Sequence, residues 1–185
     1  MNIFCLDECP HIAAKYHCDK HVVKMILELS QLLSTAHRVL DGKQGIRLSE
    51  AGRKIKCWKL EDSELNSSLY AATHVNHPSA IYVRSNKWAY KWTYTLLEAL
   101  CTEYTYRYGK VHKCESLLDN LNNYPTNMKD NNIIAFPTPA MPTEYIVKND
   151  IVQSYRNYYI GAKQKMASWK GKIAGRAIPD WYIKE

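Results

Sequence analysis

Residues 17–38 have the spacing of an amphipathic helix, and this pattern constrains the fold of the chain more than any other feature. When the segment is wound at about 100° per residue, large apolar side chains fall on one face and polar ones on the opposite face. Side chains that share one stripe of a helix can point into one cleft. We therefore predict that this helix carries the functional site. The polar stripe is a single file of His17, His21, Lys24, Glu28, Gln31 and Thr35.

Three residues of this stripe are predicted to be catalytic. Lys24 lies about one helical turn from both His21 and Glu28. A lysine that is desolvated beside another cation loses its proton more readily and can attack an electrophilic carbon. Glu28 would serve as a general acid and base or stabilise a cationic intermediate. The alternative is a buried network of salt bridges that only orients the helix. The neighbours predicted to bind substrate are His17, Lys20 and Gln31.

A second cluster of polar residues lies just before Pro78 and is predicted to bind a phosphate or a base. It consists of His74, Asn76 and His77, and the two cations Arg84 and Arg107 follow further along the chain. Aromatic residues near these cations offer surfaces on which a base can stack, although core packing is the ordinary role of any single one. These aromatic residues are Trp88, Trp92, Tyr104 and Tyr108.

Two spacings resemble those of metal ligands, namely Cys18-x-x-His21 and His74-x-x-His77. The chain has no Cys-x-x-Cys pair and no His-Glu-x-x-His motif. We therefore predict neither a metal site nor another cofactor.

The remaining pattern predicts a mainly α protein, a single-domain helical bundle of 185 residues. Helices are expected from near Pro10, over Ser79–Arg84, over Lys87–Tyr108 between an Asn86 cap and Gly109, at about 113–122, and over 150–170 after an Asp150 cap. Residues 43–60 are basic and are predicted to form a loop or small hairpin inserted into the fold, which is either a solvated insertion or a flap that contacts phosphate. Four prolines in residues 124–145 exclude a continuous helix and predict an extended strap. Residues 170–185 are predicted to be a basic, aromatic tail.

The composition favours a polyanionic partner. The chain has 25 Lys and Arg against 18 Asp and Glu, which gives a net charge of +7. Its aromatic residues are mostly 14 Tyr and 5 Trp, with only 2 Phe, and side chains that carry a polar handle suit base stacking or a wet cleft. DNA or a nucleotide is therefore the predicted partner.

The location is predicted to be the cytoplasm, without membrane association. The N-terminus lacks the pattern of a secretory signal, and no apolar run approaches the ~18 residues of a membrane span. We accordingly expect the six cysteines to be free thiols in a reducing compartment. Because Asn2 is not a small residue, we also expect Met1 to be retained.

Several sequence blocks resemble a family of small proteins common in tailed bacteriophages. The resemblance spans nearly the whole chain and implies a viral origin and the host cytoplasm, but little chemistry. The blocks are Cys18-Asp19-Lys20-His21-Val22-Val23-Lys24-Met25, His74-x-Asn76-His77-Pro78, Glu103-Tyr104-Thr105-Tyr106-Arg107-Tyr108-Gly109-Lys110-x-His112, Ala140-Met141-Pro142 and Tyr155-Arg156-Asn157-Tyr158-Tyr159.

The chain also resembles, more weakly, the pyrimidine-dimer DNA glycosylases. The shared outline is a short N-terminal arm, a first helix with a carboxylate, a His-Pro turn before a long helix, and a basic aromatic tail. Those enzymes attack the sugar C1′ with the N-terminal amine that is exposed when Met is removed, and they form a Schiff base. This sequence differs in Asn2, and the family's catalytic Glu falls nearer Lys24 than Glu28. The resemblance implies that Lys24 would replace the N-terminal amine.

Three functions are compatible with these patterns. The first is a phage DNA-acting enzyme, similar to a DNA glycosylase, that acts on a damaged or modified base extruded from the duplex. The second is group transfer onto a hypermodified phage pyrimidine or a nucleotide. The third is a non-enzymatic nucleotide-binding or host-inhibiting protein. All three need the cluster of His74 and His77 to face the stripe that carries Glu28.

Overall fold

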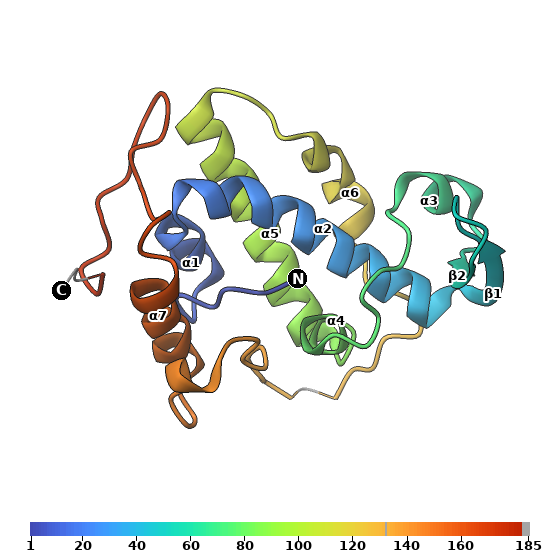
Figure 1. Ribbon diagram of the computed structural model, residues 1–185. Helices are drawn as coiled ribbons and strands as arrows, with labels where there is room; N and C mark the ends of the chain where they lie inside the picture. The colour runs from blue at the N-terminus through green and yellow to red at the C-terminus, as the bar shows by residue number, and fades with distance from the viewer. Residues whose placement is uncertain (132, 183–185) are drawn as a thin grey trace.

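Two long helices cross at the centre of the computed structural model, which describes residues 1–131 and 133–182 (Figure 1). Helix α2 spans Asp19–Asp41 and helix α5 spans Lys87–Tyr108, and the two pack against each other. The apolar face of α2 is fully buried in this contact, as the spacing of its large side chains requires. Helix α5 is buried over much of its circumference and therefore forms the centre of the core. The described chain is mainly helical.

Both ends of α5 were predicted to the residue and are confirmed. The side chain of Asn86 accepts a hydrogen bond of 2.8 Å from the backbone N–H of Ala89, which satisfies a donor that the first turn leaves open. At the other end Gly109 adopts a left-handed φ of 64°, a conformation that glycine reaches at little cost. Local capping therefore sets the length of this helix.

The N-terminal helices are divided differently from the prediction. Helix α1 spans Pro10–Tyr16, and α2 begins only at Asp19, so the predicted start of the second helix at His17 is wrong. His17 has an extended backbone with a ψ of 131°, and its N–H caps the C-terminal end of α1. Its ring Nδ1 also lies 2.7 Å from the carbonyl oxygen of Ala13. The residue therefore closes α1 instead of opening α2.

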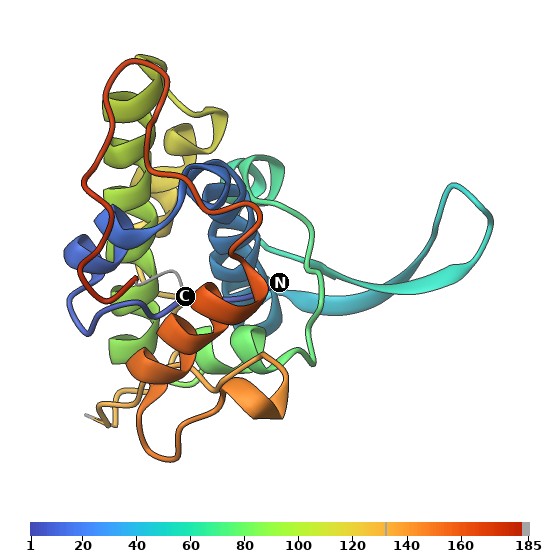
Figure 2. The same cartoon turned by 60° about the vertical axis from the view of Figure 1, so that its left-hand side comes forward.

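The basic insertion is a β-hairpin, which confirms the prediction of a loop or small hairpin. Strand β1 spans Lys43–Leu48 and pairs antiparallel with β2, which spans Lys54–Lys59. Figure 2 shows the hairpin standing out from the rest of the molecule. The short helix α3, Ser63–Ser68, returns the chain to the end of α2.

The C-terminal part has less helix than predicted. Helix α7 ends at Ala162 instead of near residue 170, because the chain turns there to make tertiary contacts. The carbonyl of Ser168 accepts a 2.7 Å hydrogen bond from the N–H of Asp19, and the indole of Trp169 donates to the carbonyl of Tyr16.

The segment expected as one helix at about 113–122 begins with a 3-10 turn. The other elements are α4 (Pro78–Val83), η1 (Lys113–Leu117), α6 (Leu118–Leu121), η2 (Thr143–Tyr145) and α7 (Ile151–Ala162).

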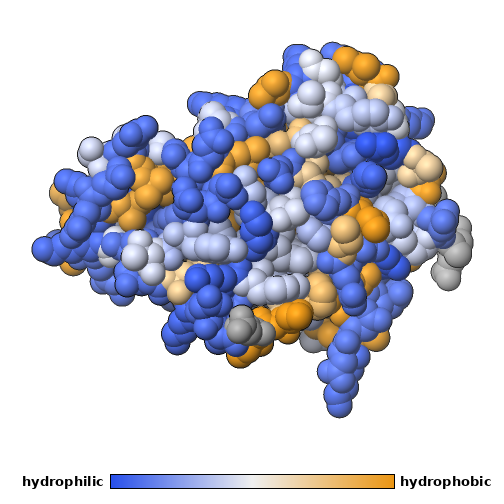
Figure 3. Space-filling model, turned by 180° about the vertical axis from the view of Figure 1, so that it is seen from behind, coloured by the Kyte–Doolittle hydropathy of each residue, from blue (hydrophilic) through white to orange (hydrophobic). Residues whose placement is uncertain are grey.

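The segment of residues 124–145 contains no α-helix among its described residues, as its prolines require. It crosses the lower edge of the view in Figure 1 and leads into α7. The face opposite to that view is mostly hydrophilic with scattered apolar patches (Figure 3). In the described part of the chain, no helix combines the length and the apolar character needed to cross a membrane.

Candidate functional site

A cleft of about 580 Å³ lies along the polar stripe of α2. Its volume is in the range of pockets that hold small ligands, roughly 300–1,000 Å³. The walls come from four parts of the chain: the N-terminus, α2, the loop before α4, and the start of η1. The lining residues are Met1, Val23, Lys24, Leu27, Glu28, Gln31, Tyr70, His74, His112, Lys113 and Cys114.

Glu28 is the best-anchored charged group of this cleft. Its carboxylate is only 12% exposed, and Oε1 lies 3.0 Å from the Lys24 Nζ. Its Oε2 accepts a 3.0 Å hydrogen bond from the N–H of Asn2 and lies 3.6 Å from the amino nitrogen of Met1. Asn2 is itself held by the hydroxyl of Tyr155, which donates to its side-chain oxygen at 2.6 Å. The carboxylate is therefore fixed between two amines.

The side chain of Lys24 is far more exposed to solvent than that of Glu28. The Lys24 side chain is 64% exposed, whereas that of Glu28 is 12% exposed, so Lys24 is not desolvated in the way that the sequence argument required. An exposed, flexible side chain of this kind can turn its amine into the cleft without repacking the core.

The loop with His74 meets the stripe of α2, so one residue of the second predicted cluster joins the first cluster at the cleft, whereas His77 does not line it. Thr73 anchors the loop, because its N–H donates a 3.1 Å hydrogen bond to the side-chain oxygen of Thr35 on α2. His74 has a left-handed φ of 48°, which costs a residue other than glycine about 1–3 kcal/mol and is enriched at functional sites. The residue lines the cleft, and its Nδ1 lies 2.8 Å from the hydroxyl of Thr73.

His77 caps α4 and lies in the electrostatic field of Glu28. Its Nδ1 accepts a hydrogen bond of 3.2 Å from the N–H of Ser79. Burial lowers the pKa of His77, the positive charges of the Met1 amino group and His74 lower it further, and Glu28 opposes the shift. The lowered pKa favours the neutral form of this histidine.

Seven of the lining residues were not predicted as site residues from the sequence, and three of these seven can contact a ligand through an aromatic ring or a charge. Tyr70 and His112 present aromatic surfaces, and Lys113 adds a cation. The Tyr70 hydroxyl lies 3.3 Å from the sulfur of Cys114, and this hydrogen bond, with burial, raises the pKa of the tyrosine to about 12. His112 packs edge-on against Tyr104 with ring centroids 5.0 Å apart. No local pattern marks these residues, because only the tertiary fold brings them to α2.

His17 and His21 lie in the core and not in the cleft. The Nδ1 of His21 is 2.5 Å from the Tyr159 hydroxyl, and its ring stacks on Phe4 with centroids 4.4 Å apart. Burial lowers the pKa of His21 to about 3 and that of His17 to about 4. Both rings are therefore neutral near pH 7 and serve packing in this geometry, in contrast to the roles predicted for them.

Arg107 is enclosed in a network that joins three helices. Its guanidinium donates to the carboxylates of Glu103 and Asp19, at 3.1 and 3.0 Å. It also donates to the backbone carbonyls of His17 and Lys15, at 2.8 and 2.9 Å. The side chain of Arg107 is fully buried, so its guanidinium cannot reach a phosphate at the surface. The predicted role of Arg107 in substrate binding is therefore wrong in this structure.

The other predicted contacts lie outside the cleft lining. Lys20 and Asn76 are exposed, and Arg84 is half-buried at the end of α4. The Nη1 of Arg84 is buried without a hydrogen-bond partner among the described residues. The predicted residues that do line the cleft are Lys24, Glu28, Gln31 and His74.

The described residues contain no group of three or more His, Cys, Asp or Glu side chains placed to hold a metal ion. The groups that could hold an organic ligand are the two aromatic surfaces of Tyr70 and His112 and the two cations Lys24 and Lys113.

No protein-family model matches the chain, and no curated protein and no solved structure matches it. The function is therefore inferred from the geometry of the cleft.

Proposed function

We propose that the chain is an enzyme that acts on a damaged or modified base in DNA, and that the cleft receives a nucleotide extruded from the duplex. One observation carries the proposal. The carboxylate of Glu28, which is only 12% exposed, lies 3.0 Å from the Nζ of the exposed Lys24 at the wall of a cleft large enough for a nucleotide. An amine next to a fixed carboxylate is the arrangement required for Schiff-base chemistry at a sugar carbon.

In the proposed reaction Glu28 accepts a proton from Lys24, and the neutral amine attacks C1′ of the extruded nucleotide. The new C1′–N bond forms as the glycosidic bond breaks, and the base leaves with the bonding electrons and takes the proton that Glu28 accepted. The nitrogen now bonded to C1′ then gives a proton to Glu28, which passes it to the ring oxygen as the C1′–O bond breaks. Water hydrolyses the resulting imine between C1′ and Lys24. The short distance between the two residues allows the proton transfer without rearrangement.

The other groups of the cleft suit a nucleotide. The rings of Tyr70 and His112 supply faces for base stacking, worth about 1–3 kcal/mol per base. Lys113 supplies a cation for a phosphate, and the net charge of +7 favours a polyanion over a neutral ligand. The weaker resemblance to the pyrimidine-dimer glycosylases is in keeping with this proposal, whereas the resemblance to the phage proteins adds little chemistry.

The proposal is tested by base release from duplex oligonucleotides that contain a cyclobutane pyrimidine dimer or a uracil. Glu28→Gln preserves the shape and an acceptor oxygen for Asn2 but cannot accept a proton, so we expect its rate to fall by about 10²–10⁴-fold. The matched control is Glu98→Gln, which removes an exposed carboxylate from α5 and should retain the wild-type rate.

Two results would overturn the proposal. One is wild-type activity in Glu28→Gln. The other is tight binding of a free nucleotide with no release of a base from either duplex, which would identify a non-enzymatic nucleotide-binding protein.

A further inference from the structure

The hairpin formed by β1 and β2 carries most of the excess positive charge of the protein. Residues 43–59 contain six basic residues and one acidic residue, a net charge of +5 out of +7 for the whole chain. Every residue of β1 is exposed. Among the described residues, none of these cations forms an ion pair with a carboxylate. The basic residues are Lys43, Arg47, Arg53, Lys54, Lys56 and Lys59.

The strand register brings two of these positive charges together, which does not favour folding. Lys43 lies directly opposite Lys59, and like charges in such a cross-strand pair destabilise a sheet. A hairpin of two strands is also only marginally stable alone. Its base is held by Arg38 of α2, which donates a 3.0 Å hydrogen bond to the carbonyl of Trp58. A partner of opposite charge would relieve the repulsion that the fold tolerates.

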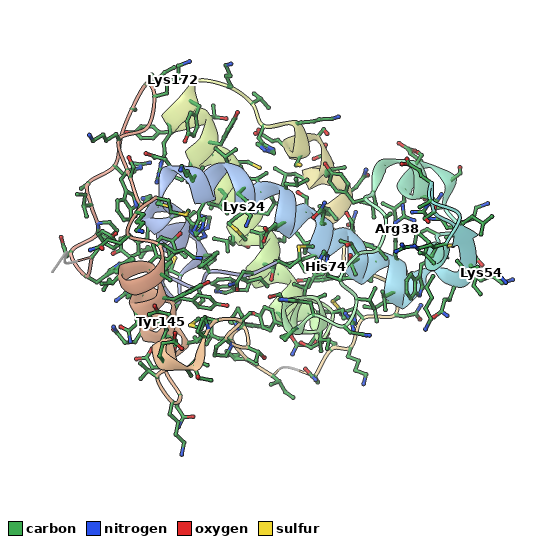
Figure 4. The ribbon with its side chains drawn as sticks, in the orientation of Figure 1. Lys24, Arg38, Lys54, His74, Tyr145 and Lys172 are labelled. Atoms are coloured by element: carbon green, nitrogen blue, oxygen red, sulfur yellow. The ribbon has the colours of Figure 1, made fainter. Side chains whose placement is uncertain are left out.

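One loop, residues 70–74, connects the wall of the cleft with a hollow beside the hairpin. Tyr70 and His74 line the cleft, while Ala71 and Ala72 line a second hollow of about 280 Å³ with residues of the hairpin. Figure 4 shows Lys24, His74, Arg38 and Lys54 following one another along the direction of α2. The 14 helical steps from residue 28 to residue 42 correspond to about 21 Å at a rise of 1.5 Å per residue.

From this geometry we propose that the hairpin is an arm that binds the phosphates of duplex DNA beside the nucleotide held in the cleft. The inference rests on the proposed function and adds to it the surface that holds the flanking duplex. A separation of about 21 Å corresponds to about six base pairs at 3.4 Å each. A two-stranded ribbon has the dimensions that enter a groove of the duplex. Ile46 and Leu48 are 70% and 63% exposed on the same face as Lys56 and Lys54, so this face can also contact sugars.

The test compares two double variants that each remove two positive charges. Lys54→Gln/Lys56→Gln changes the hairpin, and Lys170→Gln/Lys172→Gln changes an exposed segment at the opposite end of the molecule, where Figure 4 labels Lys172. Binding to a duplex of about 20 base pairs is measured by fluorescence anisotropy between about 50 and 200 mM salt. The slope of log K against log salt is negative, and each lost phosphate contact makes it less steep by about 0.9. The slope of the hairpin variant should therefore become less steep by about 1.8, and that of the control variant should not change.

Equal slopes for the two variants would overturn the inference. So would light scattering that shows a wild-type dimer which the hairpin variant abolishes, because the exposed apolar residues would then belong to an interface between copies of the chain.

A second measurement separates this inference from the proposed function. A trinucleotide that fills the cleft is too short to reach the hairpin, so the Lys54/Lys56 variant should process it at the wild-type rate. Glu28→Gln should lose this turnover and retain the wild-type salt slope on the duplex. If the hairpin variant changes the salt slope but the wild-type protein releases no base, the hairpin still binds duplex DNA and the enzymatic proposal is refuted. If the hairpin variant processes the trinucleotide more slowly than the wild type, the proposed role of the hairpin is refuted.

Discussion

The charged side chain of Arg107 is completely buried, and its hydrogen-bond partners explain how the fold accommodates the charge. Its donors satisfy two carboxylates and two backbone carbonyls from α1, α2 and α5. Glu103 lies four residues before Arg107 on α5, and this i, i+4 ion pair has a length of 3.1 Å. The approach of Asp19 and His17 from a distant part of the chain was not visible in the sequence. These long-range contacts make the residue structural in this geometry.

We predict that Arg107→Met lowers the free energy of unfolding by about 3–5 kcal/mol, because it leaves buried polar groups without their partner. Urea denaturation measures this loss. The control is Lys87→Met, which breaks an exposed 2.8 Å ion pair with Asp130 and should cost less than about 1 kcal/mol. Equal losses in the two variants would contradict the structural role of Arg107.

His37 makes stability depend on pH. The hydroxyl of Tyr90 donates to the carbonyl of Leu121 at 2.9 Å, so the Nε2–H of His37 must donate to that hydroxyl, at 2.8 Å. Burial lowers the pKa of His37 to about 4 from an ordinary value of 6.5. Between these two values the unfolded chain binds a proton that the folded protein does not bind. The free energy of unfolding therefore decreases as the pH falls from about 6.5 to about 4.

We predict that His37→Gln, which keeps a donor for Tyr90, flattens this decrease by up to about 1.4 kcal/mol per pH unit. Urea denaturation across the same pH range measures the effect. A pH dependence identical to that of the wild type would show that His37 does not titrate in this way.

At the scale of elements, the hairpin is separable from the core. All of β1 is exposed, and none of the residues of the two strands is fully buried. We predict that replacing residues 44–57 with a short Gly-Ser link shifts the thermal midpoint by less than about 4 °C, the equivalent of about 1 kcal/mol in a protein of this size. By contrast, Leu33→Ala in α2 removes a fully buried side chain and should cost about 2–5 kcal/mol. A collapse of stability in the hairpin deletion would contradict the separation of this element.

The elements that were predictable from the sequence are those that local chemistry defines. The caps of α5 at Asn86 and Gly109 are local, and both bounds followed from them. Helix α7 has its Asp150 cap as predicted, but its C-terminal end is set by contacts near Ser168 and Trp169 with distant residues. The break before α2 also depends on tertiary hydrogen bonds, so periodicity alone placed His17 on the wrong side of it.

At the scale of the whole molecule, the candidate site was only half visible in the sequence. The stripe of α2 indicated Lys24 and Glu28, and the polar loop indicated His74. The far wall with Tyr70 and His112 joins them through contacts between residues far apart in the chain, and no spacing rule reports such contacts. The same holds for His21, whose polar neighbours on the helix did not reveal that Phe4 and Tyr159 cover it.

The central claim is that Lys24 attacks a sugar carbon with the help of Glu28, and borohydride trapping tests it most directly. Borohydride reduces the imine to a stable bond between protein and DNA, and peptide mass spectrometry then identifies the residue that carries the adduct. We predict an adduct on Lys24 with a duplex that contains the damaged base, and its loss in Lys24→Arg, which keeps the charge but not the amine. No adduct in the wild-type protein, or an adduct on a different residue, would contradict the claim.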